Sequence, residues 1–557
     1  MTRTRSESRL LPVIILIIGL IFGGGVAAVC PIQCQCTEHS ADCSRRGLSE
    51  YPSFNNANIS DLDLSGNNFT KFPSQYSNLM KLNSLDLSDN FINKLDVDAL
   101  KGFKSLRTLN LAKNLITSWT DINANVSFIY APKLYTLNLS GNSLGSLGFS
   151  EGLISETLGN LDISSANIRT VDINLRTQLP KLRALTMVNN NLSQLIQFPQ
   201  ISYLRSLDLS NCSLKQFNLS YIYILNRLDL SHNPALNFSG MDLRDLIILD
   251  LSYCNLSKID LSNFASVLRL SLRGNVFESI NSITLANNSK LRNLDLSENN
   301  LTGIEKYSFN WLEELNLSKN KINQLNENII NGINFLRTLD LSHNNIQKLT
   351  GIESFGLETI NLSYCNITTI DRKALSGLGH IREIDLSHNL ISEIPDQMES
   401  TFLTKLDLSN CELSTIGDKS FQGFPELMNL NLNGNRLSNP VNCSSFRHNN
   451  YLEQIELGDN LWNCTCQYPL FLKFHKLLTS NQLKIMDQND ISCNSPICIN
   501  EEKSNVWTII LLTTLGNSLL VLFFWYCLKI IRKRMQRVYR RDFLVNYNEL
   551  NPMDPSN

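Results

Sequence analysis

A leucine pattern that recurs about every two dozen residues constrains the fold of this chain more than any other feature. The pattern is L-x-x-L-x-L-x-x-N/C-x-L and it runs over residues 59–462. One clean copy consists of Leu82, Leu85, Leu87, Asn90 and Ile92. We count 18 copies, whose N/C positions run from Asn67 to Asn460 and are mostly 21 to 25 residues apart. Such spacing predicts a stacked repeat protein.

The spacing of the leucines indicates what each repeat forms. Leucines two residues apart point to the same side of a strand. One strand cannot bury them alone, whereas stacked neighbours bury a continuous apolar column and pair in parallel. An asparagine at the turn can hydrogen-bond the backbone of adjacent coils. We predict an α/β fold, namely a curved horseshoe solenoid with one parallel β-sheet on its concave face.

These residues resemble the extracellular leucine-rich-repeat proteins, which include Toll receptors, Slit and many adhesion receptors. The resemblance covers about residues 30–500. It implies a leucine-rich-repeat solenoid that is closed at both ends by cysteine-rich caps. It identifies the fold much more closely than the function.

Two apolar segments predict the compartment. Residues 10–29 follow three arginines and contain Val26-Ala27-Ala28, which is typical of a signal peptide over 1–28, with an uncleaved anchor as the alternative. Residues 506–528 carry no formal charge and are long enough to span a bilayer. The basic tail, 529–557, predicts a cytoplasmic carboxy terminus. We therefore expect a single-pass type I plasma-membrane protein with its amino terminus extracellular.

Eight of the 14 cysteines flank the repeats. They are Cys30, Cys34, Cys36, Cys43, Cys464, Cys466, Cys493 and Cys498. A solenoid needs capped ends, and cysteine clusters in a secreted chain favour disulfides, with a zinc site as the alternative. The family resemblance implies the pairs Cys30–Cys36, Cys34–Cys43, Cys464–Cys493 and Cys466–Cys498. The predicted domains are a cap at 29–57, about 18 repeats at 58–459, and a second cap with a stalk at 460–505.

Five cysteines lie elsewhere in the extracellular part. Cys212, Cys254, Cys365 and Cys411 occupy N/C positions two coils apart within each pair, about 10 Å at a strand spacing of about 4.8 Å. A disulfide needs Cα atoms within about 7 Å, so we predict four buried thiols. Cys443 is left over, either as an unpaired thiol or as a link to a partner.

The composition excludes two classes of function. The net charge of -2 and the lack of a basic face argue against a nucleic-acid partner. No G-x-S-x-G, H-E-x-x-H or phosphate-binding glycine loop is present. We predict that the chain is not an enzyme and needs no cofactor or metal.

Two rows of residues on or beside the predicted strands are candidate ligand contacts. The first is an acidic stripe that includes Asp208, Asp229, Asp250, Asp340 and Asp385. It would attract a basic partner, although the phrase LDLS is also common filler in such repeats. The second row lies just before the N/C position and consists of His232, Tyr253, His343, Tyr364 and His388. Such side chains suit an interface or an acid-sensitive contact, with a plain solvated edge as the alternative.

Glycosylation sequons are dense in the repeats. The candidates are Asn58, Asn68, Asn125, Asn138, Asn191, Asn218, Asn237, Asn255, Asn300, Asn316, Asn361 and Asn366. Three of them, Asn138, Asn316 and Asn361, fall on predicted strands, where a glycan would obstruct the concave face.

The membrane segment and the tail support further expectations. Gly516-Asn517-Ser518 within the span suits a lateral dimer. Tyr547 and Leu550 fit a Tyr-x-x-apolar sorting motif. The tail is too short for the signalling domain of Toll receptors. We expect an adhesion receptor or co-receptor that binds a protein ligand or counter-receptor; the alternatives are an innate-immune receptor or accessory and a non-signalling matrix-binding protein.

Overall fold

The computed structural model describes residues 30–462 and 484–485, except for short interruptions. The interruptions are residues 55–57, 148–151, 173, 217, 220–221, 223, 239–242, 287–288, 304–308, 310, 326–329, 331–332, 439–442 and 447. The expected signal peptide, the cysteines of the second cap, the membrane span and the sorting motif lie outside the described residues, as does the side chain of Cys443. No helix among the described residues has the length and apolarity needed to cross a bilayer.

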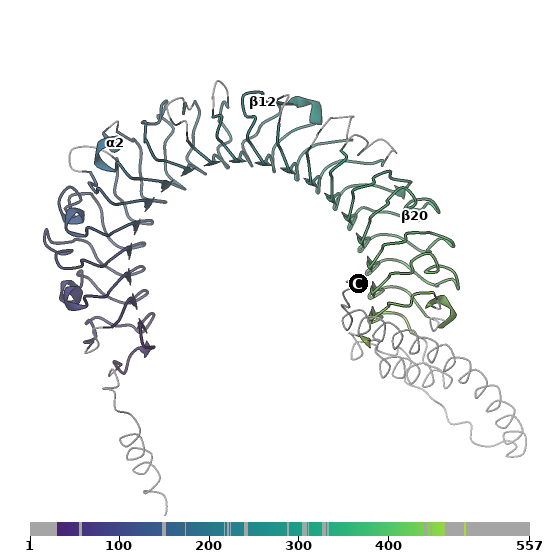
Figure 1. The fold of residues 1–557 in the computed structure, drawn as a ribbon, viewed down its shortest axis with the longest axis horizontal. Helices are drawn as coiled ribbons and strands as arrows, with labels where there is room; N and C mark the ends of the chain where they lie inside the picture. Colours follow the sequence, from purple (N-terminus) through teal and green to yellow (C-terminus); the bar gives the residue numbers. More distant parts are fainter. Residues whose placement is uncertain are drawn as a thin grey trace, which may run out of the picture. The chain divides into compact units, whose positions relative to one another are not determined.

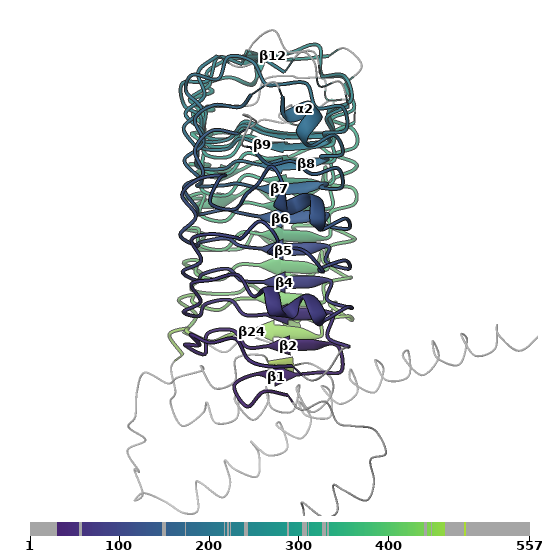
Figure 2. The same ribbon diagram turned by 90° about the vertical axis from the view of Figure 1, so that its left-hand side faces the viewer.

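The chain divides into two units, Met1–Asn323 with Ile329–Asn344, and Gln324–Asn328 with Asn345–Asn557. In unit 1 each repeat contributes one short strand, and neighbouring strands pair in parallel, as Figure 2 shows for β4 to β9. These strands lie along the inner side of the curve of unit 1 (Figure 1). They are β3 (Asp61–Asp63), β4 (Ser84–Asp86), β5 (Thr108–Asn110), β6 (Thr136–Asn138), β7 (Asn160–Asp162), β8 (Ala184–Thr186), β9 (Ser206–Asp208), β10 (Arg227–Asp229), β11 (Ile248–Asp250), β13 (Arg269–Ser271), β15 (Asn293–Asp295), β16 (Glu314–Asn316) and β17 (Thr338–Asp340).

Unit 2 repeats the same arrangement. Its parallel strands are β19 (Thr359–Asn361), β21 (Glu383–Asp385), β22 (Lys405–Asp407), β23 (Asn429–Asn431), β24 (Gln454–Glu456) and β25 (Lys484–Ile485). The predicted solenoid of parallel strands is thus confirmed within each unit.

The repeat leucines form the core. In the coil of β5, Leu106, Leu109 and Leu111 are all fully buried. The segments that connect one strand to the next on the convex side hold less helix than an α/β fold implies. Their described part contains α2 (Leu175–Gln178), short 3-10 turns such as η2 (Ser127–Tyr130), and small parallel pairs such as β12 (Ile259–Leu261) with β14 (Ile283–Leu285). Repeats of 21 to 25 residues leave too few residues after the strand and turn for a longer helix.

The N/C asparagines form a hydrogen-bonded ladder, as the sequence predicts. Asn90 donates through Nδ2 to the carbonyls of Leu64 in the preceding coil (3.1 Å) and Leu87 in its own coil (3.1 Å). Its Oδ1 accepts from the Phe69 N–H (3.1 Å). One buried amide therefore satisfies backbone groups in two coils that no strand pairing reaches.

Cysteine substitutes for asparagine in this ladder by a different arrangement. The Cys212 thiol donates to the Met187 carbonyl (3.0 Å), and the Cys212 backbone carbonyl accepts from the Leu192 N–H (2.8 Å). The four N/C cysteines are buried thiols, as predicted. Burial raises the pKa of Cys212 to about 12 and that of Cys254 to about 11, so both remain protonated and unreactive at neutral pH.

A disulfide-bonded cap covers the first repeat. Cys30 is bonded to Cys36 and Cys34 to Cys43, with Cα separations of 5.8 and 4.3 Å. The cap hairpin, β1 (Gln35–Cys36) and β2 (Ser40–Asp42), continues the sheet because β2 pairs in parallel with β3. These bonds confirm the expected disulfides at this end of the solenoid.

Candidate ligand-binding surface

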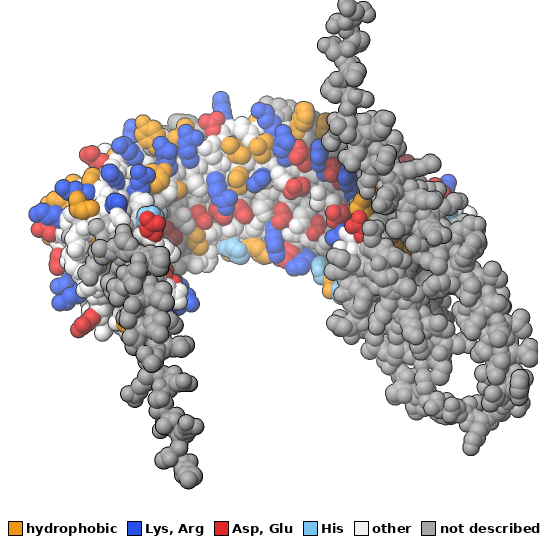
Figure 3. Space-filling model, turned by 60° about the horizontal axis from the view of Figure 1, so that its bottom comes forward, with side chains coloured by type: hydrophobic (Ala, Val, Ile, Leu, Met, Phe, Trp, Pro, Cys, Tyr) orange, Lys and Arg blue, Asp and Glu red, His pale blue; other side chains and the backbone are white. Residues whose placement is uncertain are grey.

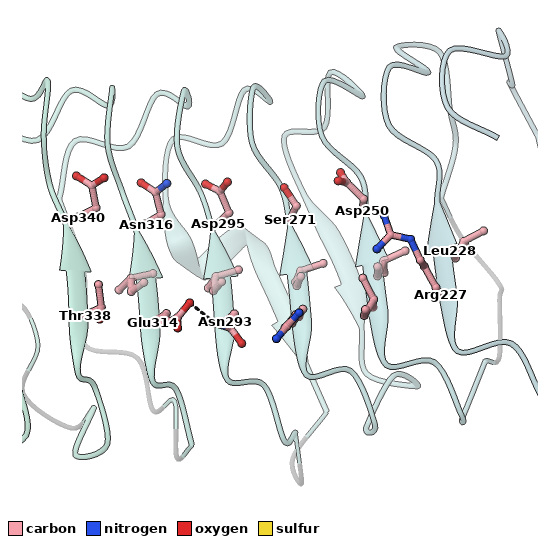
Figure 4. Close-up of a pocket in the computed structure, with 16 residues that line it drawn as sticks. Arg227, Leu228, Asp250, Ser271, Asn293, Asp295, Glu314, Asn316, Thr338 and Asp340 are labelled. Carbon is pink, nitrogen blue, oxygen red and sulfur yellow. Dashed lines mark hydrogen bonds between the residues drawn. The ribbon is translucent and has the colours of Figure 1, made fainter. Parts of the chain in front are cut away.

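The repeat strands present two rows of side chains to solvent. Each three-residue strand has a buried middle residue between two more exposed ones, which we call the first-residue row and the last-residue row. Figure 4 shows both rows in unit 1, with Asp250, Asp295 and Asp340 at one end of the strands and Arg227 at the other. In Figure 3 acidic side chains form a row across this face, with basic ones beside it.

The predicted acidic stripe is the last-residue row, and its carboxylates have a structural role. Asp250 Oδ1 accepts from the Ser252 N–H (2.9 Å) and the Ser252 hydroxyl (2.6 Å). Matching backbone bonds hold Asp208, Asp229, Asp340 and Asp385. Each aspartate therefore caps the turn that follows its strand, which explains the recurrence of LDLS without a ligand.

Stacking of the aspartates has an electrostatic cost. Asp208 and Asp229 are register partners on β9 and β10, and Asp250 follows on β11. Partial burial, together with the neighbouring Asp229 carboxylate, raises the pKa of Asp208 above its ordinary value.

The predicted His and Tyr row has an unusual backbone. Every residue before an N/C position in the described repeats has a positive φ, including His232 (57°), Tyr253 (55°), His343 (56°), Tyr364 (55°) and His388 (55°). Glycine, asparagine and aspartate tolerate this left-handed conformation best, which accounts for their frequency in the row. We call this the edge row. Its tyrosines hold a conformation that is unfavourable for a bulky side chain, whereas histidine adopts it more often.

In unit 1 the edge-row aromatics stack on one another. The rings of His232 and Tyr253 lie 4.6 Å apart at 15°. Tyr253 extends over Gly274 and donates its hydroxyl to Glu298 two coils away (2.6 Å). Arg273 and Lys319 also donate to Glu298, at 2.9 and 2.7 Å. The structure thus joins two predicted contact residues to three charged residues that the sequence did not single out.

In unit 2 the rings of Tyr364 and His388 stack at 4.1 Å and 9°. The Tyr364 side chain is 45% exposed, so its outer surface is open to a partner. His343 is also exposed and lies in unit 1. The edge row therefore contains two stacked pairs of rings, His232 with Tyr253 and Tyr364 with His388, as well as candidate contacts.

The Glu298 cluster predicts a measurable pH dependence. Hydrogen bonds from Lys319, then Tyr253 and Arg273, lower the pKa of Glu298 from 4.5 to about 2. A lowered pKa stabilises the fold above pH 4.5, and this contribution is lost as the pH falls from 4.5 toward 2. We expect the melting temperature of the native chain to exceed that of Glu298→Gln at pH 7 and the difference to shrink by pH 2.5. Tyr253→Phe, which removes one donor, should give a smaller difference; a constant difference across this range would contradict the assignment.

The structure places the glycosylation candidates on accessible surface. Eight are exposed: Asn58, Asn68, Asn125, Asn191, Asn218, Asn237, Asn255 and Asn366. Asn138, Asn300, Asn316 and Asn361 are half-buried. Three of these half-buried residues stand in the last-residue row, where Oδ1 of Asn138, for example, accepts from the Ser140 N–H (2.9 Å). A glycan on such a residue would project from the strand face.

A shallow groove of about 460 Å³ lies over the strand face of unit 1. It extends from β10 to β17, and its lining includes Arg227, Ile248, Arg269 and Asp250 (Figure 4). Sequence reasoning predicted the aspartate but missed the two arginines and the isoleucine. The signal that could have found them is the change from small or uncharged residues at this position on β4 to β9 to Arg, Ile and Arg on β10, β11 and β13.

Parallel strands, the asparagine ladder and the disulfide cap together define a leucine-rich-repeat protein. The family described as Leucine rich repeat matches residues 57–116, 80–144, 289–346, 355–400 and 401–461, and a second family of the same description matches 245–267. Human oligodendrocyte-myelin glycoprotein is 33% identical over 186 residues, which cover 32% of this chain and 39% of that protein. Human leucine-rich repeats and immunoglobulin-like domains protein 1 is 30% identical over 211 residues, or 33% of this chain and 19% of that protein.

A crystal structure of a TLR13–ssRNA13 complex also resembles this chain, with 23% identity, a TM-score of 0.47, and coverage of 79% of this chain and 73% of that one. The chain matches well under half the length of the two sequence relatives. Its repeats match the leucine-rich-repeat family, and it is similar to cell-surface and extracellular leucine-rich-repeat proteins.

Proposed function

We propose that this chain is a single-pass cell-surface recognition protein, an adhesion receptor or co-receptor that binds extracellular protein ligands or counter-receptors. The observation that carries the proposal is the strand face of unit 1, where a rigid parallel sheet exposes two rows of side chains and a groove. Solenoids use such extended faces to bind other proteins. In this proposal the edge-row residues His232, Tyr253 and Tyr364 border the face.

The proposal includes the topology and the modifications expected from the sequence. Residues 1–28 are a cleaved signal peptide, 506–528 span the membrane and 529–557 lie in the cytoplasm, where Tyr547 and Leu550 act as a sorting motif. Cys464–Cys493 and Cys466–Cys498 close the second cap. The span allows a lateral dimer through its Gly-Asn-Ser sequence.

Surface labelling tests this topology. We expect an epitope inserted after residue 29 to be stained on intact cells, and an epitope at residue 557 only after permeabilisation. Glycosidase treatment should increase the gel mobility of the chain, because many exposed asparagines lie in sequons. The matched control is the chain without residues 1–28, which should not be stained on intact cells and should not be glycosylated. Staining of both epitopes only after permeabilisation would contradict the proposal.

A further inference from the structure

Three successive coils of unit 1 differ from the six coils that precede them on the strand face. From β4 to β9 the first-residue row holds only small or uncharged residues, namely Ser84, Thr108, Thr136, Asn160, Ala184 and Ser206. On β10, β11 and β13 the same row holds Arg227, Ile248 and Arg269. The last residue of β13 is Ser271, and β5, β6, β8 and β16 likewise end without an aspartate. Charged first residues also occur on β3 and β16, but among strands β3 to β17 of the repeats two arginines flank an apolar residue only here, and all three line one groove.

The centre of this segment is apolar. Ile248 is the register partner of both arginines, Arg227 on one side and Arg269 on the other. Ile247, 38% exposed, and Leu268, half-buried, stand just before β11 and β13. Ile248 is half-buried too, and partly accessible apolar side chains on a polar face are typical of an interaction site.

The charged groups around this centre differ in how many hydrogen bonds or ion pairs they already make within the protein. Arg269 is exposed, and its guanidinium has no hydrogen-bond or ion-pair partner among the described residues. Arg227 is half-exposed, and its guanidinium approaches Asp229 only at 4.0 Å. The carboxylates of Asp229 and Asp250 already accept hydrogen bonds from the following serines. The guanidinium groups beside Ile248 are therefore available to donate to carboxylates on a partner.

The nearby aspartates limit the kind of anion that fits. Asp229 lies two residues after Arg227 on the same strand, a rise of about 7 Å. A uniformly anionic polymer or membrane that reached the arginines would also meet this acidic row and be repelled. A polypeptide can instead place acidic side chains on the arginines and an apolar side chain on Ile248, and leave the aspartates in water.

Given the proposed recognition function, on which this inference rests, we propose that the groove over β10–β13 binds a protein segment in which an apolar residue is flanked by acidic ones. The two guanidiniums pair with the acidic side chains, and Ile248 with Ile247 and Leu268 packs against the apolar one. The arginines stand two strand spacings apart, about 10 Å, and their long side chains can reach groups on either side of one buried residue.

A peptide selection tests the proposal. The full chain, purified in detergent and immobilised through its carboxy terminus, is used to select from a random 12-residue display library. We expect recovered peptides to be enriched in Asp and Glu on both sides of a Leu, Ile or Phe. Their affinity should fall by about tenfold or more in the double variant Arg227→Glu/Arg269→Glu, because each reversal replaces an attraction by a repulsion. Ile248→Ser should weaken binding with the arginines intact.

The matched control is Arg107→Glu/Arg183→Glu, which makes the same charge change at exposed arginines outside the groove. It should bind the peptides as the native chain does, and equal melting temperatures will show that both double variants fold. Asn316→Gln, which removes a sequon in the groove lining, should leave binding unchanged or strengthen it.

Several results would overturn the proposal. They are recovery of basic peptides, recovery of no peptide that depends on the arginines, or arginine-dependent binding of heparin or of phosphatidylserine vesicles in place of peptides. None of these results bears on the surface-labelling experiment, which does not involve the groove. A correctly oriented chain that binds no acidic–apolar peptide would reject this inference alone.

Discussion

Replacing Asn190 by alanine should lower the free energy of unfolding by about 2–4 kcal/mol, because it leaves several buried backbone groups unpaired. Asn190 is 4% exposed, and its Oδ1 accepts from the N–H groups of Ala166 (3.1 Å) and Ile168 (2.8 Å). Its Nδ2 donates to the carbonyls of Ile163 (3.0 Å) and Met187 (2.7 Å). Urea denaturation followed by circular dichroism measures the loss.

Two control variants separate this effect from simple loss of volume. Asn190→Cys should cost less than Asn190→Ala, since the thiol can donate as Cys212 does. Asn83→Ala removes an exposed asparagine and should change stability by less than about 0.5 kcal/mol. Equal losses for Asn190→Ala and Asn190→Cys would show that the ladder contributes little through its hydrogen bonds.

The repeat pattern determined the fold because its contacts join neighbouring coils and recur in every repeat. Each leucine pair has one way to be buried, and each N/C residue meets the same backbone groups in the next coil. One copy of the repeat has Ala166 at its N/C position, with an asparagine one residue later. There the Ala166 carbonyl accepts from the Leu144 N–H (2.9 Å) in place of an asparagine side chain, so this copy keeps the same fold. The sequence predicted the N/C thiols for the same reason, whereas the disulfides of the first cap were predicted from the cysteine cluster and the family resemblance. The scarcity of helix was not predicted, because it depends on the path of the segment that connects one strand to the next.

The candidate site was less predictable because repeat filler and ligand contacts use the same residue types. The sequence placed Asp250 and Tyr253 correctly on the face and its edge. It could not show that Asp250 caps a turn, or that Tyr253 reaches Glu298, a residue 45 positions later. The sequence also did not single out Arg269. Only the strand register shows that this arginine lies beside Ile248 in the groove.

Replacing Gly274 by alanine should destabilise unit 1 and dismantle the edge cluster. Gly274 has a φ of 65°, and a methyl group there would overlap the ring of Tyr253. The left-handed backbone costs about 1–2 kcal/mol for a residue with a side chain. Displacement of the ring also breaks its hydrogen bond to Glu298 and its stacking on His232, so we expect a total loss of about 2–3 kcal/mol in urea denaturation.

A second glycine of similar φ isolates the contribution of the ring. Gly47 has a φ of 67° and nothing within 4 Å of an added methyl group, so Gly47→Ala should show the backbone cost alone. Removing the obstructing ring in the double variant Gly274→Ala/Tyr253→Ser should make the alanine cost, measured against Tyr253→Ser, fall to the level of Gly47→Ala. If Gly274→Ala cost no more than Gly47→Ala in the native background, the ring of Tyr253 would not be held against the glycine, and the edge cluster would be looser than the contacts indicate.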